Sequence, residues 1–341
     1  MSYEVTIGIP VYNAEKYIRR TMDSALAQTF ASIEFLILDD GCTDLSIAIV
    51  KEYQQTNPRG KDIRIVTQPC NKGIGEARNR IVDEAQGNYL YFMDADDAIA
   101  PNAIELLYTA SQKYDAEMVC GSHERIEEYG EKVNHVYHKY APMVFQEENE
   151  FALWAYQEYN NLQAMTCNIL LKFDVYRKNH LCYLPISYLE DMAFSMDLPA
   201  YITHAVLLED ITYYYFCREG SASRYEKRTN IEKREIESTI DAMKYLKSNS
   251  ARWKEKPFFR QLVCKVLMTC YFVATHIVRN ESIINPPFTQ KEIRDVMHMP
   301  SFFVEMFKPG HCMLKNLYLY LLGVLPPSLS VWLIKRRIRN K

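Results

Sequence analysis

The stretch YLYFMDADDA, residues 89–98, runs from five apolar or aromatic residues directly into three carboxylates, Asp94, Asp96 and Asp97. The apolar part predicts a buried strand, and the carboxylates follow at its end. Like charges this close together repel one another and are costly to desolvate. The pattern therefore indicates either a bound cation at this point or an exposed turn.

Strand-like and helix-like segments alternate over the first 120 residues. Apolar runs predict strands at residues 5–12, 33–38, 63–68, 89–93 and 117–122, with helical patterns between them. Asn13 is predicted to cap the first helix, and Thr43 or Asp44 the second. Because near-continuous apolar strands alternating with helices are typical of parallel sheets, the sequence predicts an α/β fold with a mainly parallel sheet covered by helices on both faces.

Polar motifs follow three of the predicted strands. They are PVYN at residues 10–13, DDGCTD at residues 39–44 and DADD at residues 94–97. In sheets of this kind, ligands bind beyond the carboxyl ends of the strands. The sequence therefore predicts one site built by several loops at a single edge of the sheet.

The composition is that of an ordinary globular chain. Of its 341 residues, 48% are hydrophobic and 24% are charged, and the net charge of −3 argues against a general nucleic-acid binder. The nine cysteines contain no CxxC pair, which predicts buried free thiols in a reducing compartment. No basic and apolar leader precedes the first predicted strand, so we expect the protein to stay in the cytoplasm.

The strand–helix alternation changes after about residue 150. Two strand-like pieces remain, at residues 205–208 and 212–216, and helical patterns follow at residues 231–246 and 258–278. These segments predict a mostly helical C-terminal region.

The last stretch, NLYLYLLGVLPPSLSVWLI at residues 316–334, carries no charge and is followed by the basic KRRIRNK. Its length approaches that of a transmembrane helix, but Pro326 and Pro327 are expected to break it into two short helices. Apolar helices beside a basic cluster favour a tail that lies on a membrane surface. The alternative, a helix pair packed on the protein's own core, stays open.

The carboxylates of Asp94 and Asp96 are two positions apart at a strand end, where both can reach one Mg²⁺ or Mn²⁺. The same spacing also occurs in solvated turns, so the motif is weak by itself. An aspartyl phosphatase would need Thr or Val where Ala98 stands, and a calcium loop would need DxDxDG. Both of these functions are therefore disfavoured.

Two further motifs carry candidate nucleotide-binding side chains. Asp40 ends the second strand, where its carboxylate could accept a hydrogen bond from a pyrimidine base. The stretch NKGIGEARN, residues 71–79, brings Arg78 out of the first turns of a helix, toward a base or phosphates. Helix capping and a surface arginine are the simpler explanations of the same residues.

Two later motifs suit the transfer step of an enzyme. LEDMAF, residues 189–194, sets Glu190 and Asp191 between apolar residues, and one carboxylate could act as a general base. An acidic pair favoured by a helix dipole is the alternative. CREGSASR, residues 217–224, is basic and rich in hydroxyls, as a loop that closes over phosphates would be, or simply a flexible loop.

Taken in order, these motifs resemble the inverting family 2 glycosyltransferases with a GT-A fold. PVYNxExY is followed by QTF, DDGCTD, NKGIGEARN, DADD, LED and RxGSxS over roughly residues 4–224. The C-terminal stretch resembles the membrane-hugging tails of enzymes that build bacterial surface polysaccharide. We therefore expect a GT-A catalytic domain over residues 1–225, a helical region over 226–313 and a basic, membrane-associating tail over 314–341.

The resemblance implies which residues form the site. Donor binding is expected of Pro10, Tyr12, Glu15, Asp40, Arg78, Asp94, Ala95, Arg218, Ser221 and Ser223. Tyr12 would stack on a uracil ring, with Asp40 and Arg78 at its polar edge. Asp96 would bind the metal directly, and Asp94 would hold it through water or bind the ribose.

The resemblance also implies the reaction. Asp191 would be the base that takes a proton from an acceptor hydroxyl, and Mn²⁺ or Mg²⁺ would stabilise the departing UDP. The acceptor would be a saccharide, expected to be lipid-linked at the inner face of the plasma membrane. Two departures from the family pattern are Cys42 in place of Ser in DDGST and the stretch TCNILLKF at residues 166–173, where a Trp-Asn-Lys-like run is usual.

Two other classes of protein fit parts of the sequence. A non-catalytic sugar-nucleotide-binding or scaffold protein of a polysaccharide assembly complex would not need both DADD and LED. A nucleotidyltransferase also uses a carboxylate-bound metal, but it would need a glycine-rich basic loop after the first strand, and PVYNAEKY contains no glycine.

Overall fold

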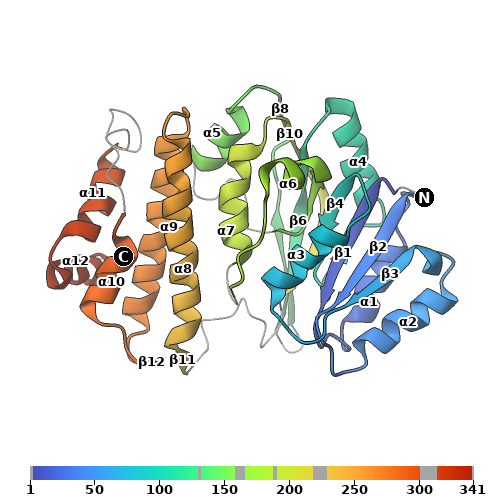
Figure 1. The fold of residues 1–341 in the computed structure, drawn as a ribbon, viewed down its shortest axis with the longest axis horizontal. Helices are drawn as coiled ribbons and strands as arrows, with labels where there is room; N and C mark the ends of the chain where they lie inside the picture. Colours follow the sequence, from blue (N-terminus) through green and yellow to red (C-terminus); the bar gives the residue numbers. More distant parts are fainter. Residues whose placement is uncertain are drawn as a thin grey trace. The chain divides into compact units, whose positions relative to one another are not determined.

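The computed structural model describes residues 3–129, 132–157, 166–186, 190–217, 229–299 and 313–339. The chain divides into two compact units, which Figure 1 shows in the colours of the sequence. The first comprises Met1–Phe151, Met165–Pro185 and Tyr201–Tyr225, and the second comprises Ala152–Ala164, Ile186–Ala200 and Glu226–Lys341. Each unit is described by itself.

The first unit is built around one large sheet. Its strands are β1 (Val5–Val11), β2 (Ile33–Asp39), β3 (Ile63–Thr67), β4 (Tyr89–Phe92), β5 (Ala98–Ile99), β6 (Met118–Tyr129), β7 (Lys132–His138), β8 (Met143–Phe145), β9 (Ile169–Lys172) and β10 (Ala205–Cys217). The strand order is β3-β2-β1-β4-β9-β6-β10-β5, with β7 paired to β6 and β8 to β10. Pairing is parallel from β3 to β4 and between β6 and β10, which confirms the predicted mainly parallel α/β fold.

The sheet contains four strands that the sequence pattern did not predict, β5, β7, β8 and β9, and one strand that it predicted as two. β9 lies between β4 and β6 and runs antiparallel to both, which the sequence pattern did not predict. The strand pieces predicted at 205–208 and 212–216 form the single strand β10, whose pairing with β6 shifts register between Leu207 and Tyr213. The apolar pattern was interrupted at this irregularity, which is why one strand looked like two.

Helices cover both faces of this sheet, as predicted (Figure 1). The helices of the first unit are α1 (Ile18–Leu26), α2 (Ser46–Thr56), α3 (Ile74–Glu84), α4 (Ala103–Tyr114) and α6 (Phe173–Asn179). On the face of α3, Gly8 leaves room for Ile81, because a Cβ at Gly8 would lie 2.4 Å from the Ile81 Cγ2. On the opposite face, Tyr108 of α4 packs edge-on against Tyr89, with ring centroids 5.8 Å apart.

Stacked histidines join β6 to β7. The rings of His123 and His138 lie 4.7 Å apart at an interplanar angle of 18°. Burial, together with the neighbouring His138 and Arg125, lowers the pKa of His123 to about 4. The folded chain therefore keeps His123 neutral at a pH where the unfolded chain would protonate it.

Acidification should therefore weaken the fold through His123. An unfolded histidine binds its proton below about pH 6.5, whereas folded His123 does so only near its lowered pKa. Stability is thus fully present above pH 6.5 and is lost as the pH falls, by about 2 kcal/mol at pH 5. Denaturant unfolding at pH 7.5 and pH 5 should show this loss in the wild type and a smaller one in His123→Asn. The exposed His180, which adopts a φ of 51° that asparagine tolerates, supplies the control variant His180→Asn; an equal pH response of all three proteins would contradict the assignment.

The second unit is helical, as expected from the C-terminal sequence. Its helices include α7 (Glu190–Asp197), α8 (Lys233–Ser250), α9 (Phe259–Arg279), α10 (Gln290–Met297), α11 (Met313–Val324) and α12 (Pro327–Arg339), and α5 (Glu150–Gln157) crosses into it from the first unit. The buried ammonium of Lys247 donates hydrogen bonds to the carbonyls of Val296 and His298 at 2.5 and 2.8 Å. A cation at these last carbonyls of α10 stabilises the end of the helix.

The predicted break in the C-terminal apolar stretch is confirmed. α11 ends at Val324 and α12 begins at Pro327, so two short helices replace one long one. Within the described residues, α9 alone has the length and apolar character needed to cross a bilayer, and 67% of its most apolar window is buried inside the protein.

The eight cysteines in the described part of the chain are free thiols. Five of them are buried as predicted, but Cys70 and Cys182 are exposed and Cys42 is partly exposed. The prediction of uniformly buried thiols is therefore wrong at these three positions, because Cys42 and Cys70 lie in the loops that follow β2 and β3 and Cys182 follows α6.

Candidate active site

The loops that follow β1, β2 and β4 meet at one edge of the sheet. In the parallel register, Val11 of β1 pairs with Asp39 of β2, and Gly8 pairs with Phe92 of β4. The residues that come next, including Tyr12 and Asp40, therefore emerge at the same edge. This is the convergence of loops that the motif positions predicted.

The first two loops are held together by hydrogen bonds in both directions. The Asn13 Oδ1 accepts the N–H and hydroxyl of Thr43 at 2.9 and 3.3 Å. The Glu15 N–H donates to the Asp44 Oδ2 at 3.0 Å, and the Glu15 Oε2 accepts the N–H of Leu45 at 3.1 Å. The carboxylate of Glu15, expected at the donor site, thus fixes one loop to the other.

Both predicted helix caps are wrong, because each helix begins later in the chain than the sequence pattern indicated. α1 begins after Tyr17, and Asn13 lies upstream in the loop with a φ of 48°. α2 begins after Leu45, and Asp44 accepts the N–H of Ser46 from one position further out. The side chains that looked like caps instead contribute to the contact between the loops.

The residues expected to bind the nucleotide base differ in how far they are exposed to solvent. Pro10 is buried within β1, whereas Tyr12 is 51% exposed and presents its ring to solvent. Asp40 is buried and accepts hydrogen bonds from the Gln68 Nε2 at 2.8 Å and the Lys72 N–H at 2.9 Å. Burial raises the pKa of Asp40, while these hydrogen bonds act in the opposite direction. An exposed ring and a fixed carboxyl at one edge suit a planar base with a polar rim.

Arg78 forms an ion pair with the first carboxylate of the DADD motif. Its Nη2 lies 3.1 Å from the Asp94 Oδ1, and the arginine side chain is almost fully buried. The guanidinium also faces the ring of Tyr183, 5.6 Å from its centroid. The structure thus brings Arg78 to Asp94, a pairing that the spacing of the two motifs did not indicate.

The third carboxylate of the motif, Asp97, points into the protein. Its two oxygens accept the hydroxyl of Tyr213 at 2.7 Å and the N–H of Phe216 at 2.9 Å, both from β10. The same Tyr213 hydroxyl accepts the N–H of Asp94 at 3.2 Å. Burial, reinforced by the charges of Asp94 and Asp96, raises the pKa of Asp97 well above its usual range. The interpretation of all three carboxylates as parts of one ligand site is therefore wrong for Asp97, which anchors the turn to β10.

Helix α1 holds the other side of this turn. The guanidinium of Arg20 donates to the carbonyl of Asp96 at 2.5 Å and lies 3.4 Å from the centroid of the Phe216 ring. The Thr21 hydroxyl donates to the carbonyl of Asp97 at 2.9 Å. Neither Arg20 nor Tyr213 was predicted from the sequence as part of the site, since a helix face and an apolar strand gave no sign that they would meet the turn.

We expect Tyr213→Phe to destabilise the first unit by about 1–3 kcal/mol, because it leaves the buried carboxyl of Asp97 without its hydroxyl partner. Denaturant unfolding of the two proteins measures the difference. Tyr214→Phe removes a hydroxyl from the next residue of β10, which is not fully buried, and should change stability by less than about 0.5 kcal/mol. Equal stabilities of Tyr213→Phe and the wild type would refute the anchoring role of Tyr213.

Asn168, which directly precedes β9, connects the three strands β4, β6 and β10. Its Nδ2 donates to the carbonyls of Gly121 and Ser122 at 2.7 and 3.1 Å, and its Oδ1 accepts the hydroxyl of Thr212 at 2.6 Å and that of Tyr91 at 3.3 Å. The residue has a φ of 64°, which asparagine tolerates better than most residues. In the stretch TCNILLKF, which departs from the family pattern, the asparagine thus has a structural task.

The remaining carboxylates fit a divalent cation in their chemistry. Asp96 is partly exposed at the turn, next to the buried Ala95, and Asp94 lies beside it. Carboxylate oxygens are the ligands that Mg²⁺ and Mn²⁺ prefer. Within the described residues, no group of three or more His, Cys, Asp or Glu is placed to hold a metal. A cation here would therefore complete its shell with substrate phosphates or water, as Mg²⁺ commonly does.

The expected base lies in the second unit. Asp191 begins α7 together with Glu190, and its Oδ1 accepts the N–H of Met192 at 2.7 Å. A carboxylate in the first turn is favoured by the helix dipole. The residues expected to cover a diphosphate, Arg218, Ser221 and Ser223, lie outside the described residues.

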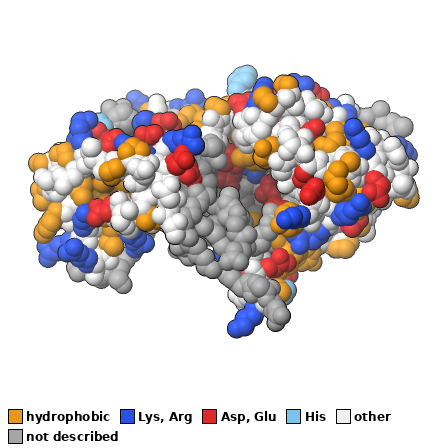
Figure 2. Space-filling view, turned by 90° about the horizontal axis from the view of Figure 1, so that it is seen from below, with side chains coloured by type: hydrophobic (Ala, Val, Ile, Leu, Met, Phe, Trp, Pro, Cys, Tyr) orange, Lys and Arg blue, Asp and Glu red, His pale blue; other side chains and the backbone are white. Residues whose placement is uncertain are grey.

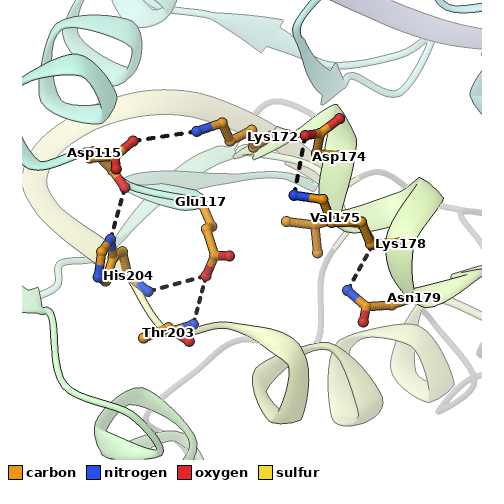
Figure 3. A pocket seen from close by; sticks show the side chains of 9 residues that line it. All are labelled: Asp115, Glu117, Lys172, Asp174, Val175, Lys178, Asn179, Thr203 and His204. Carbon is orange, nitrogen blue, oxygen red and sulfur yellow. Dashed lines mark hydrogen bonds and ion pairs between the residues drawn. The ribbon is translucent and has the colours of Figure 1, made fainter.

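A separate cavity of about 320 Å³ lies at the opposite edge of the sheet. It is lined from the start of β6 and β10 and the end of β9, whose antiparallel direction puts Lys172 at the edge away from Asp94. Figure 3 shows that its charged side chains have partners: Lys172 pairs with Asp115 at 3.3 Å, and the carboxylate of Glu117 accepts the backbone N–H groups of Thr203 and His204 at 2.7 and 3.2 Å. This cavity is therefore distinct from the candidate active site.

Comparison with known proteins identifies the family. The model described as glycosyl transferase family 2 matches residues 6–179, about half of the chain. The chain therefore belongs to the family 2 glycosyltransferases, and the resemblance seen in its motifs is confirmed.

The relatives and structural neighbours agree with this family. Chondroitin synthase of Escherichia coli is 41% identical over 116 residues, 34% of this chain and 16% of that protein. S. aureus TarS 1-349 in complex with UDP-GlcNAc has a TM-score of 0.61 at 15% identity, covering 94% of this chain and 90% of that one. Mannosyltransferase PcManGT from Pyrobaculum calidifontis, in complex with GDP-Man and Mn²⁺, has a TM-score of 0.50 at 14% identity and covers 83% and 76%. The structural likeness establishes the GT-A fold. The segment that matches the curated relatives in sequence spans less than half of the length of those relatives.

Proposed function

We propose that this chain transfers a sugar from a nucleotide-sugar, a UDP-sugar in the first place, to an acceptor hydroxyl with inversion at the anomeric carbon. The observation that carries the proposal is the meeting of Tyr12, Asp40 and the Asp94–Arg78 pair at the carboxyl edge of one sheet. A neighbour of this fold binds UDP-GlcNAc and another binds GDP-Man. The fold therefore accommodates more than one nucleotide, and the choice of UDP rests on the resemblance of Tyr12 and Asp40 to the family pattern.

In this proposal, the uracil ring of the donor stacks on the exposed ring of Tyr12. Asp40, held by Gln68 and the Lys72 N–H, accepts the N–H at the polar edge of uracil. Arg78 keeps the carboxylate of Asp94 in place beside the ribose. Pro10, Glu15 and Ala95 shape the loops around the donor, and Arg218, Ser221 and Ser223 cover its diphosphate.

Asp96, with Asp94 beside it, would hold Mn²⁺ or Mg²⁺. When bound, such a cation neutralises charge on the oxygens of a departing diphosphate. The support for it is the oxygen-rich donor set of the turn and the Mn²⁺ in a neighbour of the same fold. Arg20 and Tyr213 hold the backbone of the turn and so keep the two carboxylates in place.

Asp191 is proposed as the general base. Its carboxylate takes the proton of the acceptor hydroxyl, whose oxygen then attacks the anomeric carbon as the bond to the nucleotide diphosphate breaks on the opposite face. The proton ends on Asp191 and the electron pair on the leaving diphosphate. One displacement inverts the configuration, so no covalent intermediate on the enzyme is needed.

The acceptor is proposed to be a lipid-linked saccharide in polysaccharide biosynthesis. We infer that residues 1–225 form the catalytic domain, that 226–313 support it, and that the tail over 314–341 keeps the enzyme at the inner face of the plasma membrane. The support is the apolar and basic composition of the tail and the name of one relative, a chondroitin synthase. A non-catalytic donor-binding scaffold is the alternative function.

A thermal-shift panel tests the donor assignment. UDP-, GDP-, dTDP- and CMP-sugars are each added with and without Mn²⁺, because a ligand that binds only the folded chain raises its melting temperature. We expect a manganese-dependent rise with UDP-sugars alone. A rise in melting temperature with a different nucleotide-sugar would assign that nucleotide in place of UDP. No rise with any of the sugars, in protein shown to be folded, would reject the donor site. Release of UDP in the presence of donor and acceptor would exclude the scaffold alternative.

A further inference from the structure

Helix α11 exposes a stripe of large apolar side chains. Leu314, Leu317, Leu321 and Val324 are each between 41 and 72% exposed. Their spacing of three, four and three residues places them on one face of the helix. The helix has a separate packing face, on which Asn316, Leu319, Leu322 and Gly323 are buried. Folding of this unit therefore does not require the exposed stripe.

Helix α12 adds an aromatic side chain and a cluster of cations. Leu329 and Trp332 are exposed, and Val331 and Ile334 form the buried side of the helix. The guanidinium of Arg336 lies 5.3 Å from the centroid of the Trp332 ring. Tryptophan beside arginine is typical of protein surfaces that lie at the boundary between lipid and water.

The charge of this helix pair has one sign. Residues 313–339 contain five cations, Lys315, Lys335, Arg336, Arg337 and Arg339, and no acidic residue, although the whole chain carries a net charge of −3. Lys335 is paired with Glu281 at 2.8 Å, so the charge argument rests on the other four. On the left of Figure 2, where Figure 1 places α11 and α12, hydrophobic side chains line the outer edge and Lys and Arg side chains gather below them. This arrangement is complementary to an apolar layer with an anionic surface.

Neither helix is long enough to cross a bilayer. At 1.5 Å per residue, the 12 residues of α11 and 13 of α12 extend about 18 and 20 Å, against a hydrocarbon thickness of about 30 Å. A second copy of the chain is a poorer occupant, because a two-fold interface would place this face against itself and bring the two cationic clusters together.

We propose that the face formed by Leu314, Leu317, Leu321, Leu329 and Trp332, bordered by the cations of α12, docks on the surface of a bilayer rich in anionic lipid. Both helices lie in the plane of the membrane, with the leucine stripe inserted between the headgroups. The docking deepens the proposed function in one respect, since it gives the tail the task of bringing the enzyme to a lipid-linked acceptor. The binding itself is independent of the transfer reaction and can be measured alone.

Flotation of the full chain with vesicles tests the docking. We expect binding to vesicles of phosphatidylcholine with 30% phosphatidylglycerol, and at least tenfold weaker binding to phosphatidylcholine alone. The variant Leu317→Glu/Leu321→Glu should lose at least tenfold in partitioning to the anionic vesicles. The variant Arg336→Gln/Arg337→Gln should no longer prefer the anionic vesicles, and its binding should no longer depend on the salt concentration. Val133→Glu, at an exposed apolar position of β7, is the control and should bind like the wild type.

The outcomes separate this inference from the proposed function. The thermal shift with UDP-sugar and Mn²⁺ is measured on every variant, which also shows that each is folded. Absent vesicle binding, or binding that the leucine substitutions leave unchanged, would overturn the docking and leave the donor site untouched. Absent vesicle binding together with a dimer that the same substitutions dissociate, measured by light scattering, would assign the face to a second copy.

Discussion

Asp191→Asn should lower the turnover number by about 10²–10⁴-fold, which is the range for loss of a general base. Asparagine has the shape of aspartate but does not take up a proton at neutral pH. The Oδ1 of an asparagine can still accept the N–H of Met192, the hydrogen bond that Asp191 makes in the first turn of α7. The substitution should therefore remove the chemistry and preserve the local fold.

Two measurements separate a lost base from a damaged protein. Initial rates of UDP release with saturating donor and acceptor give the turnover number, and calorimetric titration with a UDP-sugar gives the dissociation constant of the donor. We expect the dissociation constant to change less than about threefold, because the base contacts the acceptor and not the donor. Glu190→Gln, at the adjacent carboxylate, is the matched control and should retain most of the activity. Turnover near the wild-type value in Asp191→Asn would exclude Asp191 as the base.

Asp96→Ala should abolish the manganese dependence of donor binding. The carboxylate of Asp96 is the proposed direct ligand of the cation, and even the loss of a residue that only orients a ligand costs 10–100-fold in metal affinity. We expect at least about 100-fold weaker binding of the donor in the presence of Mn²⁺, approaching the affinity of the wild type in EDTA. The Arg20 hydrogen bond goes to the backbone carbonyl of residue 96, so it can persist in the variant.

Calorimetry with and without Mn²⁺, on the wild type and on two variants, tests this expectation. Asp115→Asn serves as the control, because it removes one carboxylate from the cavity at the opposite edge of the sheet. Asp115 has a φ of 45°, which asparagine also tolerates. An Asp96→Ala protein that keeps the full manganese effect would show that the cation, if it binds, is held elsewhere.

The parts of the fold that depend on local pattern were predictable. Buried strands such as residues 33–38 appear as unbroken apolar runs, and the double proline at 326 and 327 separates two helices, because these signals act within a few residues. The antiparallel β9 was not predictable, since its four residues carry no signal for the neighbours between which they insert. Which strands pair depends on residues far apart in the chain, and a short apolar run carries no information about its neighbours.

The same contrast applies to the site. Ordered motifs located the loops with Tyr12, Asp40 and Asp94, because their spacing along the chain follows the alternation of strands and helices. The inward turn of Asp97 could not be predicted, since it depends on a hydroxyl 116 positions later in the chain, that of Tyr213. Three adjacent carboxylates look alike in sequence, and their surroundings in the fold separate them into different roles.

The hydrogen bonds between the first two loops have a consequence for engineering. Asn13 and Glu15 bind Thr43, Asp44 and Leu45 in both directions, so neither loop keeps its shape without the other. A chimera that takes one loop from a homologous enzyme would leave donors and acceptors on both sides without matching partners. Transplants intended to change the nucleotide should therefore exchange the two loops together, as a single cassette drawn from one parent.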